Sequence, residues 1–318
     1  MALETDAFTS YSAIGNRDDL SDLIANVAPT DTPFITSVES RKAENVLFEW
    51  QTDSLAAAST SNVVLEGDTA TIDAATATVR MKNYCCISDK IPRVTGTQQA
   101  INAAGRRDEL AYQIVKRTKE LRRDMESILL NNAAYVAGNS TTARITAGIE
   151  AWFYTNVSRG SGGASTSDGT ASDGDTLATD GTQRVFTESL LKDVLKLTFD
   201  SGGDPDVIMV GSFNKQKLST FTGNATRNVT AEDRKLYAAI DIYESDFGEL
   251  EVMTNRFQRA RSALVLQKDM WEVAYLRRPG MVALAKTGDT ESRQIIAEYG
   301  LVAKNALSSG IVADLTTS

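Results

Sequence analysis

Ser212 is the side chain whose surroundings in the sequence most resemble a site for covalent chemistry. It follows Gly211, directly after the apolar run 206–210 that is typical of a buried strand, and it precedes a helix predicted to begin near Phe213. A serine at such a turn can serve as a nucleophile or bind phosphate, but neither a GxSxG nor a GxxxxGKS/T pattern is present. The chain also contains no His that would activate the hydroxyl. We therefore expect Ser212 to be a helix N-cap, and a soluble enzyme that uses carboxylates and Ser212 stays as an alternative function.

Few other groups could hold a metal or carry out redox chemistry. Cys85 and Cys86 are adjacent, so they cannot form a CxxC metal site. We expect both to be small apolar side chains in a strand. Asp173, Asp175 and Asp180 have the composition of a calcium loop, but the full ligand spacing with its terminal Glu is missing. The sequence therefore predicts no catalytic residue, no metal and no cofactor.

The composition excludes several broad classes of protein. The chain has 318 residues, of which 42% are hydrophobic and 24% charged, so it can fold around a sizeable core. Its 33 Lys and Arg against 42 Asp and Glu leave a formal charge of −9, which disfavours wrapping nucleic acid through bulk attraction. No signal peptide opens the chain, and no stretch approaches the roughly 20 apolar residues of a membrane span. We expect a globular protein that is made in a reducing cytosol.

The first part of the chain is predicted to be an arm followed by a long hairpin. Residues 1–44 mix small and polar side chains, and a short helix is expected at 17–27. Apolar residues alternate with others at 46–50, and a second alternation at 71–80 predicts the partner strand. A two-stranded ribbon is marginal in water, so we expect the hairpin 45–82 to lie on a neighbouring surface.

The strongest local pattern is helical and covers residues 106–137. A helix of this length is about 45 Å long, longer than a small domain needs, which predicts a structural spine. Acidic residues interleave in the sequence with its basic cluster, and this favours a solvated or salt-bridging face between subunits over a phosphate-binding patch. The cluster comprises Lys116, Arg117, Lys119, Arg122 and Arg123.

The second half alternates helical and strand patterns after a polar insertion. Residues 158–184 are almost entirely small and polar, which predicts a flexible surface loop that contributes little core. A helix at 188–199 and the strand at 206–210 follow, and a turn is expected at 277–280. Further strands are predicted at 249–254, 263–268, 271–276, 281–286 and 292–304.

This order of elements resembles that of the major capsid proteins of tailed bacteriophages, which share the α+β fold named after phage Hong Kong 97. The resemblance covers nearly the whole chain, and the stretches Thr32-Pro33-Phe34 and 204–218 are similar to segments of phage head proteins. It implies an N-terminal arm at 1–44, an extended hairpin called the E-loop at 45–82, a peripheral domain at 83–157 with the spine helix 106–137, an axial domain at 158–260 with the insertion 158–184, and C-terminal return strands at 261–318.

The resemblance also implies a function. The chain is expected to be a structural, non-enzymatic component of the virion that assembles in the host cytoplasm as hexamers and pentamers of an icosahedral shell. The shell encloses double-stranded DNA without specific binding and involves no membrane, and a separate scaffolding protein, a portal and in some cases a decoration protein are the implied partners. An encapsulin-like nanocompartment shell, which has the same fold and holds an enzyme cargo, is the alternative within this fold.

Two departures from the family bear on assembly. Some members join their subunits through an isopeptide bond from an E-loop lysine, but no Lys occurs here between Lys42 and Lys82, so this cross-link is not expected. Members often begin with a long helical scaffolding segment, for which this chain is too short, and scaffolding is therefore expected from a separate chain.

Two groups of residues are candidates for contacts between subunits. The first group lies in the hairpin, although Phe48 and Trp50 have the alternative of packing on their own spine helix, and the second lies past Gly223, where a solvated loop is the alternative. The candidates are Phe48, Trp50, Val63, Val64, Leu65, Arg227, Asn228, Arg234 and Lys235.

Overall fold

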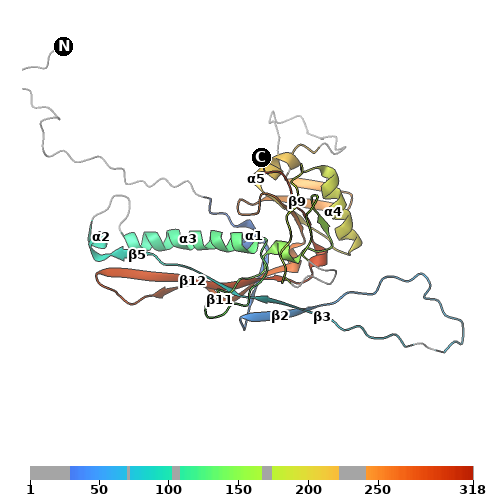
Figure 1. The fold of residues 1–318 in the computed structure, drawn as a ribbon, viewed down its shortest axis with the longest axis horizontal. Coiled ribbons are helices and arrows are strands. Elements are labelled where there is room, and N and C mark those ends of the chain that lie inside the picture. Colours follow the sequence, from blue (N-terminus) through green and yellow to red (C-terminus); the bar gives the residue numbers. More distant parts are fainter. Residues whose placement is uncertain (1–28, 70–71, 102–107, 167–173, 222–240, 318) are drawn as a thin grey trace, which may run out of the picture.

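The computed structural model of the protein describes residues 29–69, 72–101, 108–166, 174–221 and 241–317. The helix expected at 17–27 lies outside these residues. The described chain combines two sheets, a separate hairpin and a small number of helices, which confirms the predicted α+β class (Figure 1). No helix in this part of the chain is both long and apolar enough to cross a bilayer.

An elongated five-stranded sheet forms one end of the body, and the long helix α3 (Glu109–Leu129) lies along it (Figure 1). The strand order is β1-β11-β12-β4, and β5 pairs with the far end of β12. The pairing is parallel between β1 and β11 and antiparallel elsewhere. The strands are β1 (Glu39–Lys42), β4 (Cys86–Lys90), β5 (Arg93–Thr95), β11 (Trp271–Ala283) and β12 (Thr290–Ala303). Two short helices, α1 (Pro33–Ser37) and α2 (Gly96–Ala100), lie near the two ends of α3.

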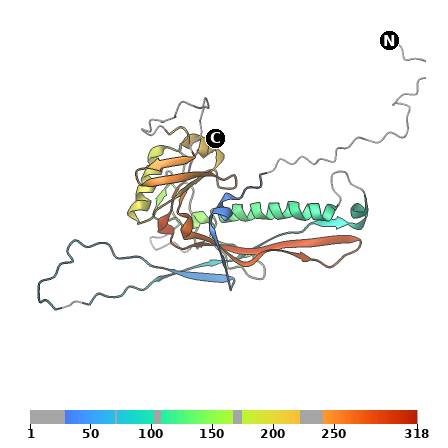
Figure 2. The same cartoon turned by 180° about the vertical axis from the view of Figure 1, so that it is seen from behind.

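The two faces of this sheet bury different partners. Because successive side chains of a strand point to opposite faces, Tyr275 and Leu301 join the main core with Leu121 of α3. Ala274 and Val302, one residue along each strand, instead join a separate cluster that contains residues of the hairpin. The sheet therefore lies between α3 and the Phe48 side of the hairpin, whereas Met81 of the hairpin joins the main core, and Figure 2 shows the same layering from behind.

A second, six-stranded sheet forms a compact α/β unit at the other end of the body. Its order is β6-β13-β10-β7-β9-β8, with two helices packed against it. All four residues of both β7 and β10 are buried, as expected for central strands made of continuous apolar runs. The elements are β6 (Val157–Ser158), α4 (Glu188–Asp200), β7 (Val207–Val210), α5 (Ser212–Leu218), β8 (Ile242–Ser245), β9 (Gly248–Thr254), β10 (Ala263–Leu266) and β13 (Gly310–Val312); 3₁₀ turns occur at Ile149–Trp152, Lys268–Met270 and Ala306–Ser308.

The hairpin consists of β2 (Leu47–Thr52) and β3 (Val79–Tyr84), joined by a long loop that projects from the body (Figure 1). The predicted partner strand is present but lies further along the chain than 71–80: pairing begins only at Val79, and Thr71 lies outside the described residues. Residues 71–78 alternate mostly small Ala and Thr side chains and offer little apolar area to bury, whereas Met81 further along is 5% exposed and belongs to the main core.

The spine helix is shorter than the predicted 106–137. It begins at Glu109 because the Asp108 carboxylate caps it, accepting the backbone N–H of Ala111 at 3.0 Å. It ends at Leu129, after which the chain turns back so that Val136 pairs with Ile145. Of residues 130–137 only Leu130 is buried, and the half-buried or exposed residues 131–137 form a turn and an isolated bridge rather than further helical turns.

The turn predicted at 277–280 is also absent. Strand β11 continues through this segment with two irregularities in its pairing, between Tyr275 and Arg277 and between Arg277 and Gly280. Such bulges tolerate the missing N–H of Pro279. The chain reverses instead at 284–289, where Gly288 has a φ of +65°.

The insertion 158–184, which is predicted to be flexible and to contribute little core, packs against itself and the body in its described residues. Ala164 pairs with Thr179, and Ala178 is buried. A Cβ at Gly181 would lie 2.6 Å from the carbonyl oxygen of Gly160, so the small side chains here permit close packing of two backbone segments. The low-complexity composition therefore reflects close approach of the chain to itself.

Candidate inter-subunit surfaces

The described residues offer no centre for catalysis. Ser212 is exposed and is the first residue of α5, and Gly211 holds the N-cap position without a side-chain cap, so the predicted capping role of Ser212 is wrong. Asp180 pairs with Arg259 at 2.6 Å, and within the described ranges no group of acidic, Cys or His side chains is arranged to hold a metal. Asp173 lies outside the described residues.

The two cysteines are structural. Both are free and buried, and they point to opposite faces of the long sheet, Cys86 toward α3 and Cys85 toward the hairpin. Burial raises the pKa of each thiol to about 11. Because the thiolate is the reactive form, neither side chain is a good nucleophile at neutral pH.

Phe48 and Trp50 pack within their own chain. Phe48 is 6% exposed and lies against Cys85, Ala274 and Val302, on the sheet face opposite α3. The Trp50 Nε1–H donates to the carbonyl oxygen of Ala303 at 2.8 Å. Both rings thus fasten the base of the hairpin to the long sheet, rather than packing on the spine helix.

Val63, Val64 and Leu65 lie on the projecting loop and are 82%, 82% and 80% exposed. Leu55 and Ile72 are exposed on the same loop to an even greater extent. Monomeric proteins rarely leave such a concentration of large apolar side chains in water. The apolar triplet therefore has the properties of a surface that another molecule covers.

The loop is also acidic. Residues 53–78 contain Asp53, Glu66, Asp68 and Asp73 and no Lys or Arg. The combination of apolar and acidic side chains favours a partner surface that presents both an apolar strip and basic groups.

Arg227, Asn228, Arg234 and Lys235 lie outside the described residues, as does the whole range 222–240. Their assignment to contacts around a capsomer axis remains a prediction.

Glu126 is a structural residue that the sequence analysis missed. Its side chain is fully buried on α3, and its carboxylate accepts the backbone N–H groups of Phe34 at 2.7 Å and Ile35 at 2.9 Å. It also accepts the Asn255 Nδ2–H at 2.7 Å. Desolvation raises the pKa of this carboxyl, and the three hydrogen bonds oppose that shift. Nothing in the helical pattern distinguishes Glu126 from the exposed acids of the same helix.

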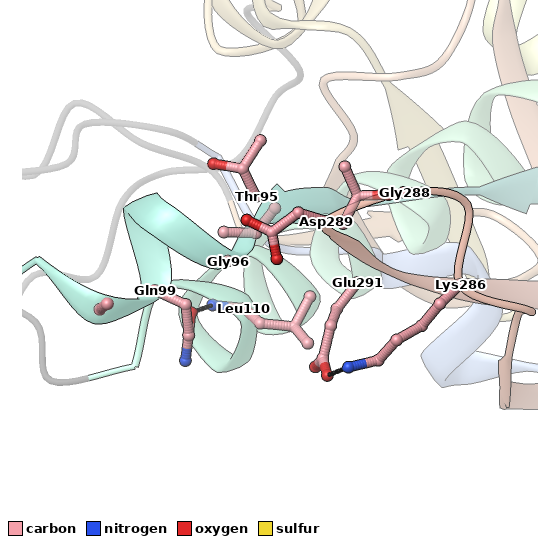
Figure 3. A pocket seen from close by; sticks show the side chains of 11 residues that line it. Thr95, Gly96, Gln99, Leu110, Lys286, Gly288, Asp289 and Glu291 are labelled. Carbon is pink, nitrogen blue, oxygen red and sulfur yellow. Dashed lines mark hydrogen bonds and ion pairs between the residues drawn. The ribbon is translucent and has the colours of Figure 1, made fainter.

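A cavity of about 310 Å³ lies where α2 meets the turn between β11 and β12 (Figure 3). The Gly96 N–H donates to the Asp289 carbonyl oxygen at 3.0 Å, and there is no room for a Cβ at Gly96 because the Asp289 carboxylate occupies that space. Lys286 and Glu291 on its wall form an ion pair at 2.6 Å. The Gly96 contact holds the turn between β11 and β12 against α2, and the ion pair joins the two sides of that turn.

The architecture is that of a phage capsid protein with the Hong Kong 97-type fold, the class that the sequence resemblance implied. The chain superimposes on a chain of the cyanophage A-1(L) capsid with a TM-score of 0.68 and 14% identity, covering 98% of this chain and 100% of that one. It superimposes on a Gordonia phage Cozz chain with a TM-score of 0.63 and 12% identity, covering 100% and 99%. At these identities the likeness establishes the fold alone.

The chain belongs to the SU10 major capsid protein family, whose model matches residues 5–316. A major capsid protein of Escherichia phage Phieco32 is 25% identical over 337 residues, covering 96% of each sequence. The protein is therefore a structural capsid protein of the virion and not an enzyme, which confirms both predictions and removes the serine-based alternative. The family also favours a phage head over a nanocompartment shell.

Proposed function

We propose that this capsid protein assembles into hexamers and pentamers that close into an icosahedral shell around double-stranded DNA. The observation that carries the proposal is the projecting loop 53–78. All its described residues are exposed, and its backbone hydrogen bonds are local, such as that from the Val63 N–H to the Ser61 carbonyl oxygen at 2.8 Å. A ribbon of this kind gains stability by lying across a neighbouring subunit.

The geometry of this contact supports a ring. The loop of one copy and the surface that receives it are different patches of the same chain, so the contact is heterologous. Such contacts generate closed rings when the rotation between subunits closes. Rings of five and six subunits then share the same contact with a small change of angle.

The two sheets support a division of the chain into capsid domains. The hairpin 45–82 corresponds to the E-loop, and the range 83–157, with α3 and much of the long sheet, corresponds to the peripheral domain. The range 158–260 corresponds to the axial domain, and the strands within 261–318 return to both sheets. Arg227, Asn228, Arg234 and Lys235 fall in the proposed axial domain.

The proposed partners are a separate scaffolding protein, a portal and, in some heads, a decoration protein. Because residues 43–81 contain no Lys, the shell is held by noncovalent contacts of the E-loop rather than by an isopeptide bond from it.

Substitution of Val63, Val64 and Leu65, which we call the loop apex, tests the proposal. The full chain is expressed alone and with the scaffolding protein, and light scattering and electron microscopy record capsomers, tubes or shells. We expect the variant V63S/V64S/L65S to fold normally, because these side chains touch no core, and to lose most of its assembly, because about 2 kcal/mol of burial per side chain is removed from each contact.

Val115→Ser is the matched control, since Val115 is a 57% exposed apolar residue on α3, away from the loop. The control should assemble like the wild type. A wild-type chain that stays monomeric under both conditions would contradict the proposed function, and normal assembly of the triple variant would exclude the apex as the contact.

A further inference from the structure

Most of the basic side chains of α3 gather on one side of the helix, and the one acid within the same arc, Glu126, is buried. At 3.6 residues per turn, four basic side chains fall within about 120° of the circumference, on the side that faces away from Leu121 and Met125. These four are Lys116, Lys119, Arg122 and Arg123, and we call them the basic face.

The acidic side chains of α3 are occupied elsewhere. Asp124 pairs with Lys90 of β4 at 2.6 Å, and Glu120 pairs with Arg117 at 2.5 Å. Glu126 is buried beneath α1. Glu109 accepts the Gln113 side-chain amide at 2.8 Å. Of these acids only the buried Glu126 interacts with the basic face, through Arg122.

Three of the four basic side chains are exposed, and the fourth, Arg123, is half-buried. Lys116 and Lys119 are exposed and make no ion pair within the part of the chain that the structure describes. Arg122 is exposed and donates to the Thr32 hydroxyl at 2.7 Å and to the Thr36 hydroxyl at 3.0 Å, and its charge interacts with the buried Glu126 carboxylate. Arg123 lies over the ring of Phe257 at 5.4 Å. The result is a positive strip on a chain whose formal charge is −9.

The acidic loop of a neighbouring copy is not the partner of this strip. The hairpin and α3 lie on opposite sides of the five-stranded sheet, so the loop leaves the subunit on the side away from α3 (Figures 1 and 2). In a closed shell every subunit presents the same side inward. A neighbour's loop therefore runs along the hairpin side, and the basic face is left to whatever lies against the α3 side of the wall.

We propose that the basic face of α3 lines the lumen of the shell and contacts the phosphate backbone of the packaged double-stranded DNA. This inference rests on the proposed shell function. Lys116 and Lys119, one helical turn apart, neutralise phosphates without reading bases, so the contact is independent of sequence and weakens with salt. The negative charge of the rest of the subunit keeps the contact local, and DNA is free to move along the wall.

The first experiment measures DNA binding by the purified full chain in the oligomer it forms. The probe is a fluorescent duplex of random sequence, titrated at several NaCl concentrations. We expect K116E/K119E to weaken binding at least about tenfold near 50 mM salt, and to reduce the slope of log K against log salt by about 2. The conservative variant K116R/K119R should bind like the wild type.

A control variant with the same change of charge distinguishes an effect of the basic face on DNA binding from an effect of the net charge of the chain. K42E/K196E alters two exposed lysines, one on β1 and one on α4, and should lose far less affinity than K116E/K119E. Equal losses in the two variants, or no DNA binding by the wild type at low salt, would overturn the proposal. So would loss of assembly by K116E/K119E with unchanged DNA binding, because the face would then be a subunit contact.

The second experiment tests whether the basic face lies on the inside of the shell. Intact and dissociated shells are treated with an amine-reactive polymer too large to cross the wall, and peptides are mapped by mass spectrometry. Lys116 and Lys119 should react only after dissociation, and equal labelling in intact shells would place them outside and overturn the lumen assignment. A wild-type chain that forms no shell would overturn both the proposed function and the assignment of the basic face to the lumen. The part of the proposal that concerns DNA binding is tested separately by the first experiment.

Discussion

The Glu126 carboxylate on α3 accepts the backbone N–H of Phe34 at 2.7 Å, although the two residues are 92 positions apart in the sequence. It accepts the Ile35 N–H and the Asn255 side-chain amide as well. One buried acid thus joins the segment that enters the fold, the spine helix and the segment between β9 and β10. These are three parts of the chain that would have to stay in register while subunits assemble.

Glu126→Ala is expected to destabilise the fold strongly. The substitution leaves the buried Phe34 N–H and the part-buried Ile35 N–H without an acceptor, and it leaves the Asn255 amide with only the Met209 sulfur at 3.5 Å. Each unsatisfied buried donor costs about 1–3 kcal/mol. Denaturant unfolding of the full chain measures the effect. Asp124→Asn is the control on the same helix, because it breaks only the half-exposed pair with Lys90 and should cost less than about 1 kcal/mol. Equal effects of the two substitutions would contradict the role of Glu126.

The raised pKa of Glu126 predicts a pH dependence. A folded-state pKa above the ordinary value of 4.5 means that the folded protein binds the proton more tightly than the unfolded chain. Between these two values the stability therefore rises as the pH falls. The groups that face the carboxyl are Arg122 on the same helix, Tyr275 of β11 and the Asn255 amide.

Glu126→Gln removes this titration. We expect the stability of the wild type relative to E126Q to increase when the pH is lowered from 7.5 to 5, as measured by denaturant unfolding at each pH. A difference between the two proteins that is constant over this range would show that the carboxyl does not titrate there.

Trp50 is expected to hold the base of the hairpin. Trp50→Phe removes the hydrogen bond to the Ala303 carbonyl oxygen and should cost about 1 kcal/mol, while most of the ring packing on Trp152 is kept. Trp50→Ala also removes the packing and should cost about 3–5 kcal/mol. Limited proteolysis should then cut the hairpin at Leu47–Thr52 faster, whereas V63S/V64S/L65S should leave that rate unchanged.

Much of the fold could be predicted because its signals are local. The runs at Val207–Val210 and Ala263–Leu266 are continuous, and only a central strand buries such a run on both faces. The apolar face of α3 appears at helical spacing, and the exposed triplet at 63–65 stands out in a segment of small polar residues. These features need no knowledge of distant parts of the chain.

The remaining features depend on contacts between distant segments. The alternation around Phe48 and Trp50 indicates that one face of the strand is buried, but their partners Val302 and Ala303 lie about 250 residues away. Glu126 looks like any surface acid until α1 packs over it. The composition of residues 158–184 is typical of a flexible loop, and only the close approach of Gly160 and Gly181 reveals a packed segment.

The pairing of Glu150 with Arg259 gives a test of that packed segment. The Glu150 side chain is fully buried, and it accepts hydrogen bonds from the Arg259 Nη1–H at 2.7 Å and the Ser262 hydroxyl at 2.6 Å, while Arg259 also reaches Asp180 in the insertion. Glu150→Ala removes two hydrogen bonds of a buried carboxylate, but Arg259 keeps its ion pair with Asp180, so the substitution should cost about 1–3 kcal/mol in denaturant unfolding. Glu188→Ala, which breaks the more exposed pair with Lys192, should cost less than about 1 kcal/mol. Because Arg259 then loses one of its two acidic partners and is held less firmly against Asp180, E150A should also make the insertion more sensitive to protease, and an unchanged cleavage rate there would show that Asp180 is held without Glu150.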